Sequence, residues 1–118
     1  MAGLQLAYRP GDNLDSIAAE IGTLARRFPW VRMVMLGELC TYGANTGLAQ
    51  QMPGQAEARL CELAREHDLW LVPGSLYERH EGRIFNTTPV INPQGEVIAR
   101  YRKMFPFAPY ERNVAGGD

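Results

Sequence analysis

The sequence predicts an α/β domain with a mixed sheet and helices on one face of that sheet. Two segments with the apolar spacing of amphipathic helices alternate with short apolar runs in the first part of the chain, and two extended segments joined by turn residues follow them. Strands that alternate with helices are typical of a parallel sheet, whereas a hairpin adds antiparallel strands. The 118 residues fit a single domain.

The first strand and the first helix are predicted near the N-terminus. Residues 4–8 form a short apolar run that suits a strand. Residues 14–28 carry apolar side chains at positions i, i+3, i+4 and i+7, which predicts an amphipathic helix. Asp12 or Asn13 is the expected N-cap, and Pro29 ends the helix because proline cannot continue one.

The next elements repeat this alternation. Residues 31–36 are almost entirely apolar, as in a strand that is buried on both faces. The polar, glycine-rich residues 41–54 predict a loop, and the second helix is expected directly after it, with an apolar face formed by Ala56, Leu60, Leu63 and Ala64. Residues 69–72 predict the next strand. Trp30 and Trp70, which flank or lie in these strands, are expected in the core.

A hairpin is predicted after these elements. Residues 83–92 and 96–103 are extended runs, and they are separated by the turn residues Asn92-Pro93-Gln94-Gly95. Side chains alternate along a strand, so one face of the second run is expected to carry Val97, Ala99, Tyr101 and Lys103, and the other face Ile98, Arg100 and Arg102. The first of these faces is apolar until it reaches Lys103 at its end, so Lys103 is a candidate functional residue.

The composition restricts the classes of partner to expect. Hydrophobic residues make up 46% of the sequence and charged residues 21%, and the formal net charge is -1. This balance indicates a globular protein and favours neither a nucleic acid nor an anionic membrane as a partner. No basic leader precedes an apolar stretch, and no run approaches the length of a membrane span, so a cytoplasmic location is expected.

The cysteines do not indicate a disulfide or a metal site. Cys40 and Cys61 are too few for a disulfide framework, and no Cys/His cluster predicts a bound metal. Cys40 follows Glu38 by two residues, but this spacing within one loop gives poor geometry for mutual hydrogen bonding, and no histidine accompanies them. We therefore expect Cys40 to be a small buried side chain rather than a nucleophile, and Cys61 to flank the apolar stripe of the second helix.

Glu38 is the first candidate for a catalytic role. It directly follows the apolar run 31–36, so its carboxylate lies at the carboxyl end of a core strand, where open α/β sheets bind their ligands. A partly desolvated carboxylate at that place is suited to act as a base, and Tyr42 and Asn45 are candidates for the wall of a pocket beside it. Alternatively, Glu38 is a solvated loop residue or a helix cap, and Tyr42 and Asn45 are ordinary loop residues.

Lys103 and Glu111 are the other candidates. A lysine on the inward face of a strand end requires a partner carboxylate or a developing anion, although a lone lysine is more often a surface residue whose stem covers apolar neighbours. Glu111 follows Lys103 by eight residues, in a loop of aromatic residues and prolines that would hold it in place. On its own, Glu111 is equally consistent with a surface charge.

Several segments resemble motifs of the nitrilase superfamily of carbon–nitrogen hydrolases. The strand-end glutamate motif of the family resembles Leu36-Gly37-Glu38-Leu39, and its catalytic lysine motif resembles Tyr101-Arg102-Lys103-Met104-Phe105-Pro106-Phe107. Further similar segments, in the same order and spacing, are Trp70-Leu71-Val72-Pro73-Gly74-Ser75, Phe85-Asn86-Thr87, residues 90–97, Pro109-Tyr110-Glu111 and Gly116-Gly117-Asp118. The resemblance covers almost the whole chain, and its specificity lies in the ordered set.

The resemblance implies a fold and a reaction. The family fold is a four-layer α-β-β-α sandwich, of which this chain would be a part, and its members are usually homodimers or larger. They hydrolyse non-peptide C–N bonds of small amides, nitriles or carbamoyl compounds through a Glu–Lys–Cys triad, without a metal or cofactor. Glu38 matches the general base, Lys103 the cation that stabilises the oxyanion, and Glu111 a second glutamate that positions the lysine and the substrate.

The resemblance also implies that one catalytic group lies outside the chain. The nucleophilic cysteine of the family lies on a later strand, and neither Cys40 nor Cys61 occupies that place. We therefore expect residues 1–118 to be the N-terminal portion of a single domain, truncated before the nucleophile. Such a piece is expected to be inactive, and to be marginally stable and prone to aggregation because the missing strands would leave a sheet edge and apolar faces exposed.

Several functional alternatives remain at this point. The residues around Lys103 and Glu111 look like the amidase form of the family rather than that of true nitrilases, and a glutaminase or acyltransferase branch would share the triad. A different class is a non-catalytic, binding or dimerising paralogue that has lost its nucleophile. A generic α/β domain would leave the ordered motifs as coincidence.

Overall fold

All six strands of the protein belong to one sheet. The computed structural model describes residues 1–118, and its elements are, in order, β1 (Ala2–Leu4), α1 (Leu14–Arg27), β2 (Met33–Leu36), the 3-10 turn η1 (Thr46–Leu48), α2 (Gln55–Glu66), β3 (Trp70–Val72), β4 (Leu76–His80), β5 (Arg83–Ile91) and β6 (Val97–Arg102). The pairs β1–β2 and β2–β3 are parallel, and every pairing of β5 is antiparallel. The predicted mixed sheet is confirmed.

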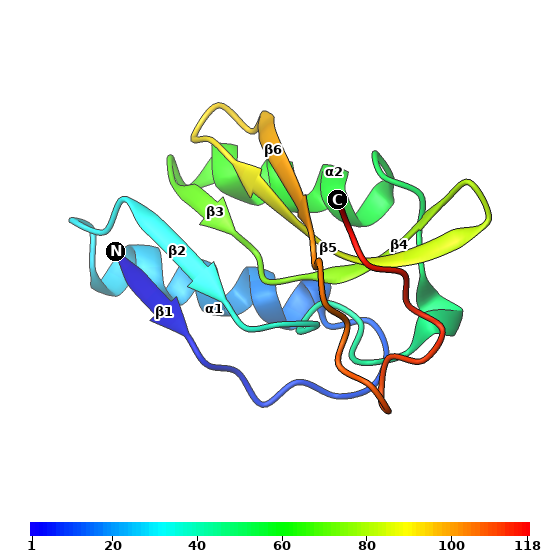
Figure 1. Cartoon of the computed structure of the whole chain (residues 1–118). Helices are drawn as coiled ribbons and strands as arrows, with labels where there is room; N and C mark the ends of the chain where they lie inside the picture. The colour runs from blue at the N-terminus through cyan, green and yellow to red at the C-terminus, as the bar shows by residue number, and fades with distance from the viewer.

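Both helices cover the same face of the sheet (Figure 1). Their apolar stripes join the helix-facing side chains of the strands in one core, whose members are Ile17, Ile21, Leu24, Val31, Val34, Leu36, Cys40, Leu60, Leu63, Ala64, Leu69, Leu71 and Ile91. The predicted helices and the predicted apolar face of the second helix are therefore confirmed. Neither helix has the length and apolar character needed to span a membrane.

Strand β5 organises the second half of the sheet. Thr87 pairs with Leu76 of β4 and also with Arg102 of β6, so these two strands lie on opposite edges of β5. Ile91 pairs with Leu71 of β3, so β3 and β4 share the edge opposite to β6. The chain bends between β3 and β4, and this bend lies beside the segment that leaves β2 (Figure 1).

A β-bulge in β6 changes the predicted alternation of its side chains. Val90 pairs with Ala99 whereas Ile91 pairs with Val97, so the pairing shifts by one residue between them. As a result Val97 packs against the core under the helices, and Tyr101 and Lys103 line a cavity elsewhere. The prediction that Val97 shares a face with Tyr101 and Lys103 is therefore wrong, because a bulge places an extra residue in one strand.

Two strands differ from the sequence prediction. The first strand is Ala2–Leu4 instead of residues 4–8, because parallel pairing with β2 matches Ala2 to Val34 and Leu4 to Leu36. Strand β4 is absent from the prediction. It forms a hairpin with β5 through Glu81 and Gly82, which both have positive φ values of 48° and 74°. Positive φ at both central residues is the backbone that two-residue hairpin turns favour.

Of two further local predictions, the N-cap at Asn13 is confirmed in its position, whereas the burial of Trp30 is wrong. Asn13 occupies the N-cap position of α1, but its side chain makes no capping hydrogen bond. Instead, its Oδ1 accepts from the N–H of Arg9 and its Nδ2 donates to the carbonyl of Arg9. Asp12 accepts a hydrogen bond from the N–H of Leu14, the first residue of the helix. Trp30, expected in the core, is 71% exposed and contacts Phe28 edge to face.

Gly74, in the bend after β3, allows the ends of β2 and β3 to approach each other. Its φ is +71°, and a Cβ atom at this position would overlap the carbonyl oxygen of Gly37. Gly82 has nearly the same φ of +74° but open space around it. We predict that Gly82→Ala costs about 1–2 kcal/mol from the left-handed backbone alone, and that Gly74→Ala costs about 1–3 kcal/mol more because it adds the steric overlap.

Urea unfolding of the two variants measures this difference. Equal losses of stability in Gly74→Ala and Gly82→Ala would show that the close approach of Gly37 and Gly74 does not constrain the fold.

Candidate active site

Glu38 lies in the turn that follows β2. The N–H of the next residue, Leu39, donates a hydrogen bond of 3.1 Å to the hydroxyl oxygen of Ser75, which ties this turn to the bend after β3. Leu39 itself has a positive φ of 55°. The turn therefore directs Glu38 across the end of the sheet. Its side chain is 57% exposed, so the expected partial desolvation of this carboxylate is not found in the chain.

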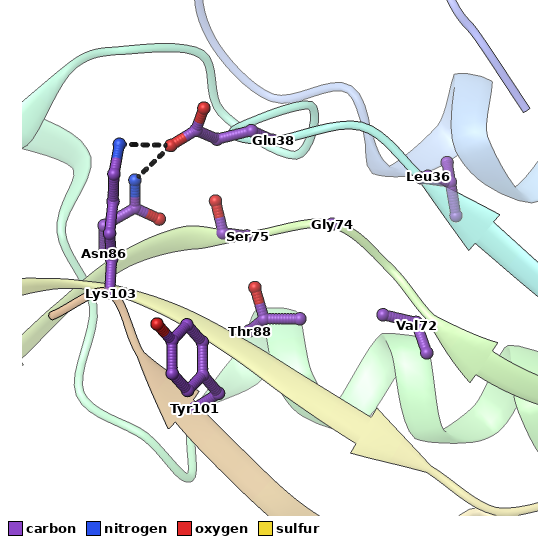
Figure 2. A pocket seen from close by; sticks show the side chains of 9 residues that line it. All are labelled: Leu36, Glu38, Val72, Gly74, Ser75, Asn86, Thr88, Tyr101 and Lys103. Carbon is purple, nitrogen blue, oxygen red and sulfur yellow. Dashed lines mark hydrogen bonds and ion pairs between the residues drawn. The ribbon is translucent and has the colours of Figure 1, made fainter. Parts of the chain in front are cut away.

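Lys103 is the first residue after β6, and its backbone continues the pairing with β5. Its N–H donates to the carbonyl of Asn86 at 2.8 Å. Its Nζ donates to Oε1 of Glu38 at 2.8 Å and to Oε2 of Glu111 at 2.7 Å. Figure 2 shows the lysine side chain rising from β6 toward Glu38. The structure thus brings the three residues of the family motifs together at one end of the sheet.

Glu111 is held from several sides in the loop after β6. Its side chain is only 6% exposed. Besides Lys103, its Oε2 accepts a hydrogen bond of 2.7 Å from the N–H of Phe107, and the N–H of Glu111 donates to the carbonyl of Phe107 at 2.9 Å. The ring of Phe107 stacks on that of Tyr110, with centroids 5.6 Å apart. The loop therefore fixes Glu111 in place, as its aromatic residues and prolines suggest.

Asn86 is a member of this cluster that the sequence analysis does not identify as a site residue. It lies in the middle of β5 and is 3% exposed. Its Nδ2 donates to Oε1 of Glu38 at 2.8 Å and to Oε1 of Glu111 at 2.9 Å. Figure 2 shows that Asn86 and Lys103 approach the same oxygen of Glu38. The sequence feature that could have identified Asn86 is its residue type, because asparagine is disfavoured in strands and is therefore unexpected in the middle of one.

The electrostatics of the cluster favour an ionised carboxylate and a protonated lysine. Burial raises the pKa of Glu111, but hydrogen bonds from Lys103, the Phe107 N–H and Asn86 outweigh it, so the pKa lies below its ordinary value. The pKa of Lys103 is raised, first by its hydrogen bond to Glu111 and then by that to Glu38. At neutral pH Lys103 is therefore a cation.

Glu38 and Lys103 line two cavities. The first, of about 270 Å³, lies over the sheet and is also lined by Leu36, Val72, Gly74, Ser75, Asn86, Thr88 and Tyr101 (Figure 2). The second, of about 150 Å³, is bounded by the loops and is also lined by Leu39, Ala44, Tyr77, Phe107, Tyr110 and Glu111. The polar cluster therefore faces space that a small molecule can enter.

Tyr42 and Asn45 line neither of these cavities. Asn45 is exposed and caps η1, because its side-chain oxygen accepts a hydrogen bond of 2.9 Å from the N–H of Gly47. Tyr42 is half-buried, and burial raises the pKa of its phenol, which lies near Gln50 and Asp12. A role for either residue in the wall of the pocket stays a prediction.

Neither cysteine belongs to the cluster. Cys40 is 2% exposed, and its thiol donates to the carbonyl oxygen of Pro73 at 3.3 Å. Burial raises the pKa of this thiol, which makes it a poor nucleophile. Cys61 lies on α2 and packs against the core, as predicted. No group of three or more His, Cys, Asp or Glu side chains is arranged to hold a metal ion.

The free hydrogen-bonding capacity of the cluster defines what it can do. Both oxygens of Glu111 are engaged, whereas Glu38 uses only Oε1. An ammonium has three N–H donors, and Lys103 uses two of them, so one donor remains for an oxygen of a ligand. The cluster therefore offers one accessible proton acceptor, Oε2 of Glu38, beside one cationic donor.

Comparisons with known proteins identify relatives of the chain. The chain is 37% identical to human omega-amidase over 108 residues, which cover 88% of this chain and 38% of the relative. It is 30% identical to a formamidase of Helicobacter acinonychis over 112 residues, 85% of this chain and 32% of the relative. A carbon–nitrogen hydrolase from Helicobacter pylori has a similar structure, with a TM-score of 0.83 and 25% identity over 98% of this chain and 44% of that one.

The chain thus spans less than half the length of each of these proteins. The model of the carbon–nitrogen hydrolase family matches residues 2–116, which is nearly the entire sequence. The chain therefore belongs to the carbon–nitrogen hydrolase family.

Proposed function

We propose that this chain supplies the carboxylate and lysine groups of a centre that hydrolyses the C–N bond of a small amide. The observation that carries the proposal is the position of Lys103 Nζ, which lies 2.8 Å from Glu38 and 2.7 Å from Glu111. A cation fixed between two carboxylates beside a cavity is suited to stabilise a developing oxyanion. The relatives named omega-amidase and formamidase support an amide as the substrate.

The free groups of the cluster assign a role to each residue. Oε2 of Glu38 takes the proton of a thiol, whose sulfur attacks the carbonyl carbon of the amide. The negative charge that develops on the carbonyl oxygen is stabilised by the remaining N–H donor of Lys103. When the C–N bond breaks, Glu38 returns the proton to the leaving nitrogen. Glu38 then takes a proton from the water that cleaves the thioester, and the thiol is regenerated. Glu111 holds Lys103 throughout.

The thiol in this scheme must come from outside residues 1–118. Cys40 is buried and bound to a backbone carbonyl, and Cys61 lies on the helix layer. We therefore infer that the chain is the N-terminal portion of a longer catalytic domain. The exposed large apolar side chains support this inference, because half of them lie between residues 98 and 110, close to the site. Phe105 and Tyr110 are among them, and each is 82% exposed.

The direct test uses the product of the source gene read beyond the codon for Asp118. We expect it to release ammonia from short aliphatic amides and to lose this activity on alkylation with iodoacetamide. Variants Cys40→Ala and Cys61→Ala should keep both the activity and its sensitivity to the reagent, since neither thiol reaches the cluster. An open reading frame that stops after Asp118, or amide hydrolysis that survives complete alkylation, would contradict the proposal.

A further inference from the structure

Asn86 occupies an unusual position between two groups of like charge. A single nitrogen, Nδ2, donates to Glu38 at 2.8 Å and to Glu111 at 2.9 Å, and the backbone carbonyl of Asn86 accepts the N–H of Lys103. Asn86 thus contacts all three charged residues of the site. It is the only uncharged side chain that bonds to both carboxylates.

The two carboxylates require such a donor because Lys103 alone does not neutralise them. Two negative charges and one positive charge leave a net charge of −1, so Glu38 and Glu111 repel each other across a short distance. Glu111 is secured independently, because the Phe107 N–H binds it and its side chain is 6% exposed. Glu38 has no such support, since its side chain is 57% exposed and bonds only to Lys103 and Asn86.

The same contacts also determine which oxygen of Glu38 is free. Asn86 and Lys103 both donate to Oε1, which leaves Oε2 without a partner (Figure 2). We propose that Asn86 is a positioning residue that fixes Oε1 of Glu38 beside Lys103 and thereby presents Oε2 as the proton acceptor. The part of this inference that concerns proton transfer rests on the proposed function, whereas the positioning of Glu38 does not.

The chemistry of the amide explains why this residue type is suitable. An aspartate at position 86 would add a third carboxylate to the cluster, and a leucine of similar size would offer no donor. The nitrogen of an asparagine amide carries two N–H groups, so each carboxylate receives one of them. The backbone of Asn86 is held by its pairing with Tyr77 of the neighbouring strand. Its side chain is buried there, which restricts the movement of the amide.

The test measures the charge state of Lys103 by ¹³C NMR titration of its side chain in the complete product of the source gene. With Asn86→Leu, Glu38 is expected to swing into solvent, so the pKa of Lys103 falls. Glu38→Gln also lowers the pKa of Lys103 by removing one of the two charges. If Asn86 acts through Glu38, then adding Asn86→Leu to Glu38→Gln produces no further fall, so the two effects are not additive.

Asn92 provides the matched control, since it is a second buried asparagine on the same hairpin. It bonds to Glu96 at 2.8 Å and to the turn between β5 and β6, away from the site. Asn92→Leu should destabilise the fold and leave the titration of Lys103 unchanged. If Asn86→Leu does not fold, Asn86→Ser is measured instead.

Two results would overturn the inference. In one, the Asn86 variant titrates like the wild type. In the other, the variant lowers the pKa of Lys103 equally with and without Glu38. Because no turnover is measured, both outcomes are independent of whether the longer protein hydrolyses amides.

Discussion

Glu38→Gln is expected to lower kcat for amide hydrolysis in the longer protein by a factor of about 10²–10⁴, the usual contribution of a general base. Glutamine has the shape of glutamate, and its amide oxygen can still accept from Lys103 and Asn86, which donate to Oε1 at 2.8 Å each. The change therefore removes the basic oxygen while it preserves the packing of the cluster. Because the substrate still meets Lys103, KM should change much less than kcat.

Steady-state kinetics of the variant, with ammonia release as the readout, measure this effect. The matched control is Glu62→Gln on the surface of α2, where Glu62 only forms an exposed ion pair with Arg59. It should leave kcat unchanged. If Glu38→Gln retains wild-type kcat, then Glu38 is not the base, and the cluster has a structural or binding role instead.

Arg102→Leu is expected to destabilise the chain by about 3–5 kcal/mol, the cost of leaving a buried charge without its partner. Glu78 on β4 is 3% exposed on its side chain, and Arg102 binds it through two hydrogen bonds of 2.8 and 2.7 Å. The guanidinium also lies 4.3 Å from the centroid of the Phe85 ring. Without it, Thr87 is the only side-chain donor that still reaches Glu78, at 2.6 Å.

Urea unfolding at two pH values separates the charge effect from the loss of packing. The hydrogen bond from Arg102 holds the pKa of Glu78 below its ordinary value despite burial. A carboxyl with a lowered folded-state pKa stabilises the protein above its unfolded pKa of about 4.3, and this contribution disappears as the pH falls through the folded pKa. The difference between wild type and Arg102→Leu should therefore be large at pH 7 and shrink below about pH 4.

The exposed pair Arg59–Glu62 is the control for this experiment. Arg59→Leu should cost less than about 1 kcal/mol, because solvent screens that pair. A pH-independent loss of stability in Arg102→Leu would mean that the guanidinium acts through its contacts with Phe85 and not through its charge.

The sequence predicts those elements whose pattern is local. Apolar spacing identifies both helices, and turn residues identify the hairpin of β5 and β6. Strand β4 is missed because Glu78, Arg79 and His80 make it look like a polar loop. Glu78 is nevertheless buried, and the groups that neutralise it, Arg102 and Thr87, are distant in sequence. Local composition cannot reveal a strand whose burial depends on such a partner.

The candidate site is predicted in part for the same reason. Glu38 and Lys103 follow strands, so their convergence at one end of the sheet is accessible from element order together with the family resemblance. Asn86 is missed because its role depends on facing two side chains that come from other segments, Glu38 and Glu111. Trp30 is misplaced because the turn after α1 directs it outward, where it is 71% exposed.

The bulge in β6 bears on how this region tolerates changes in length. The extra residue, at Ile98, lies between the turn and the segment that carries Lys103, and the pairing of Ala99 with Val90 is regular again after it. A deletion at Ile98 would restore unbroken alternation and leave the pairing of the segment 99–102 unchanged. The bulge therefore acts as a spacer, because the loss of its extra residue would not turn Lys103 away from its carboxylates.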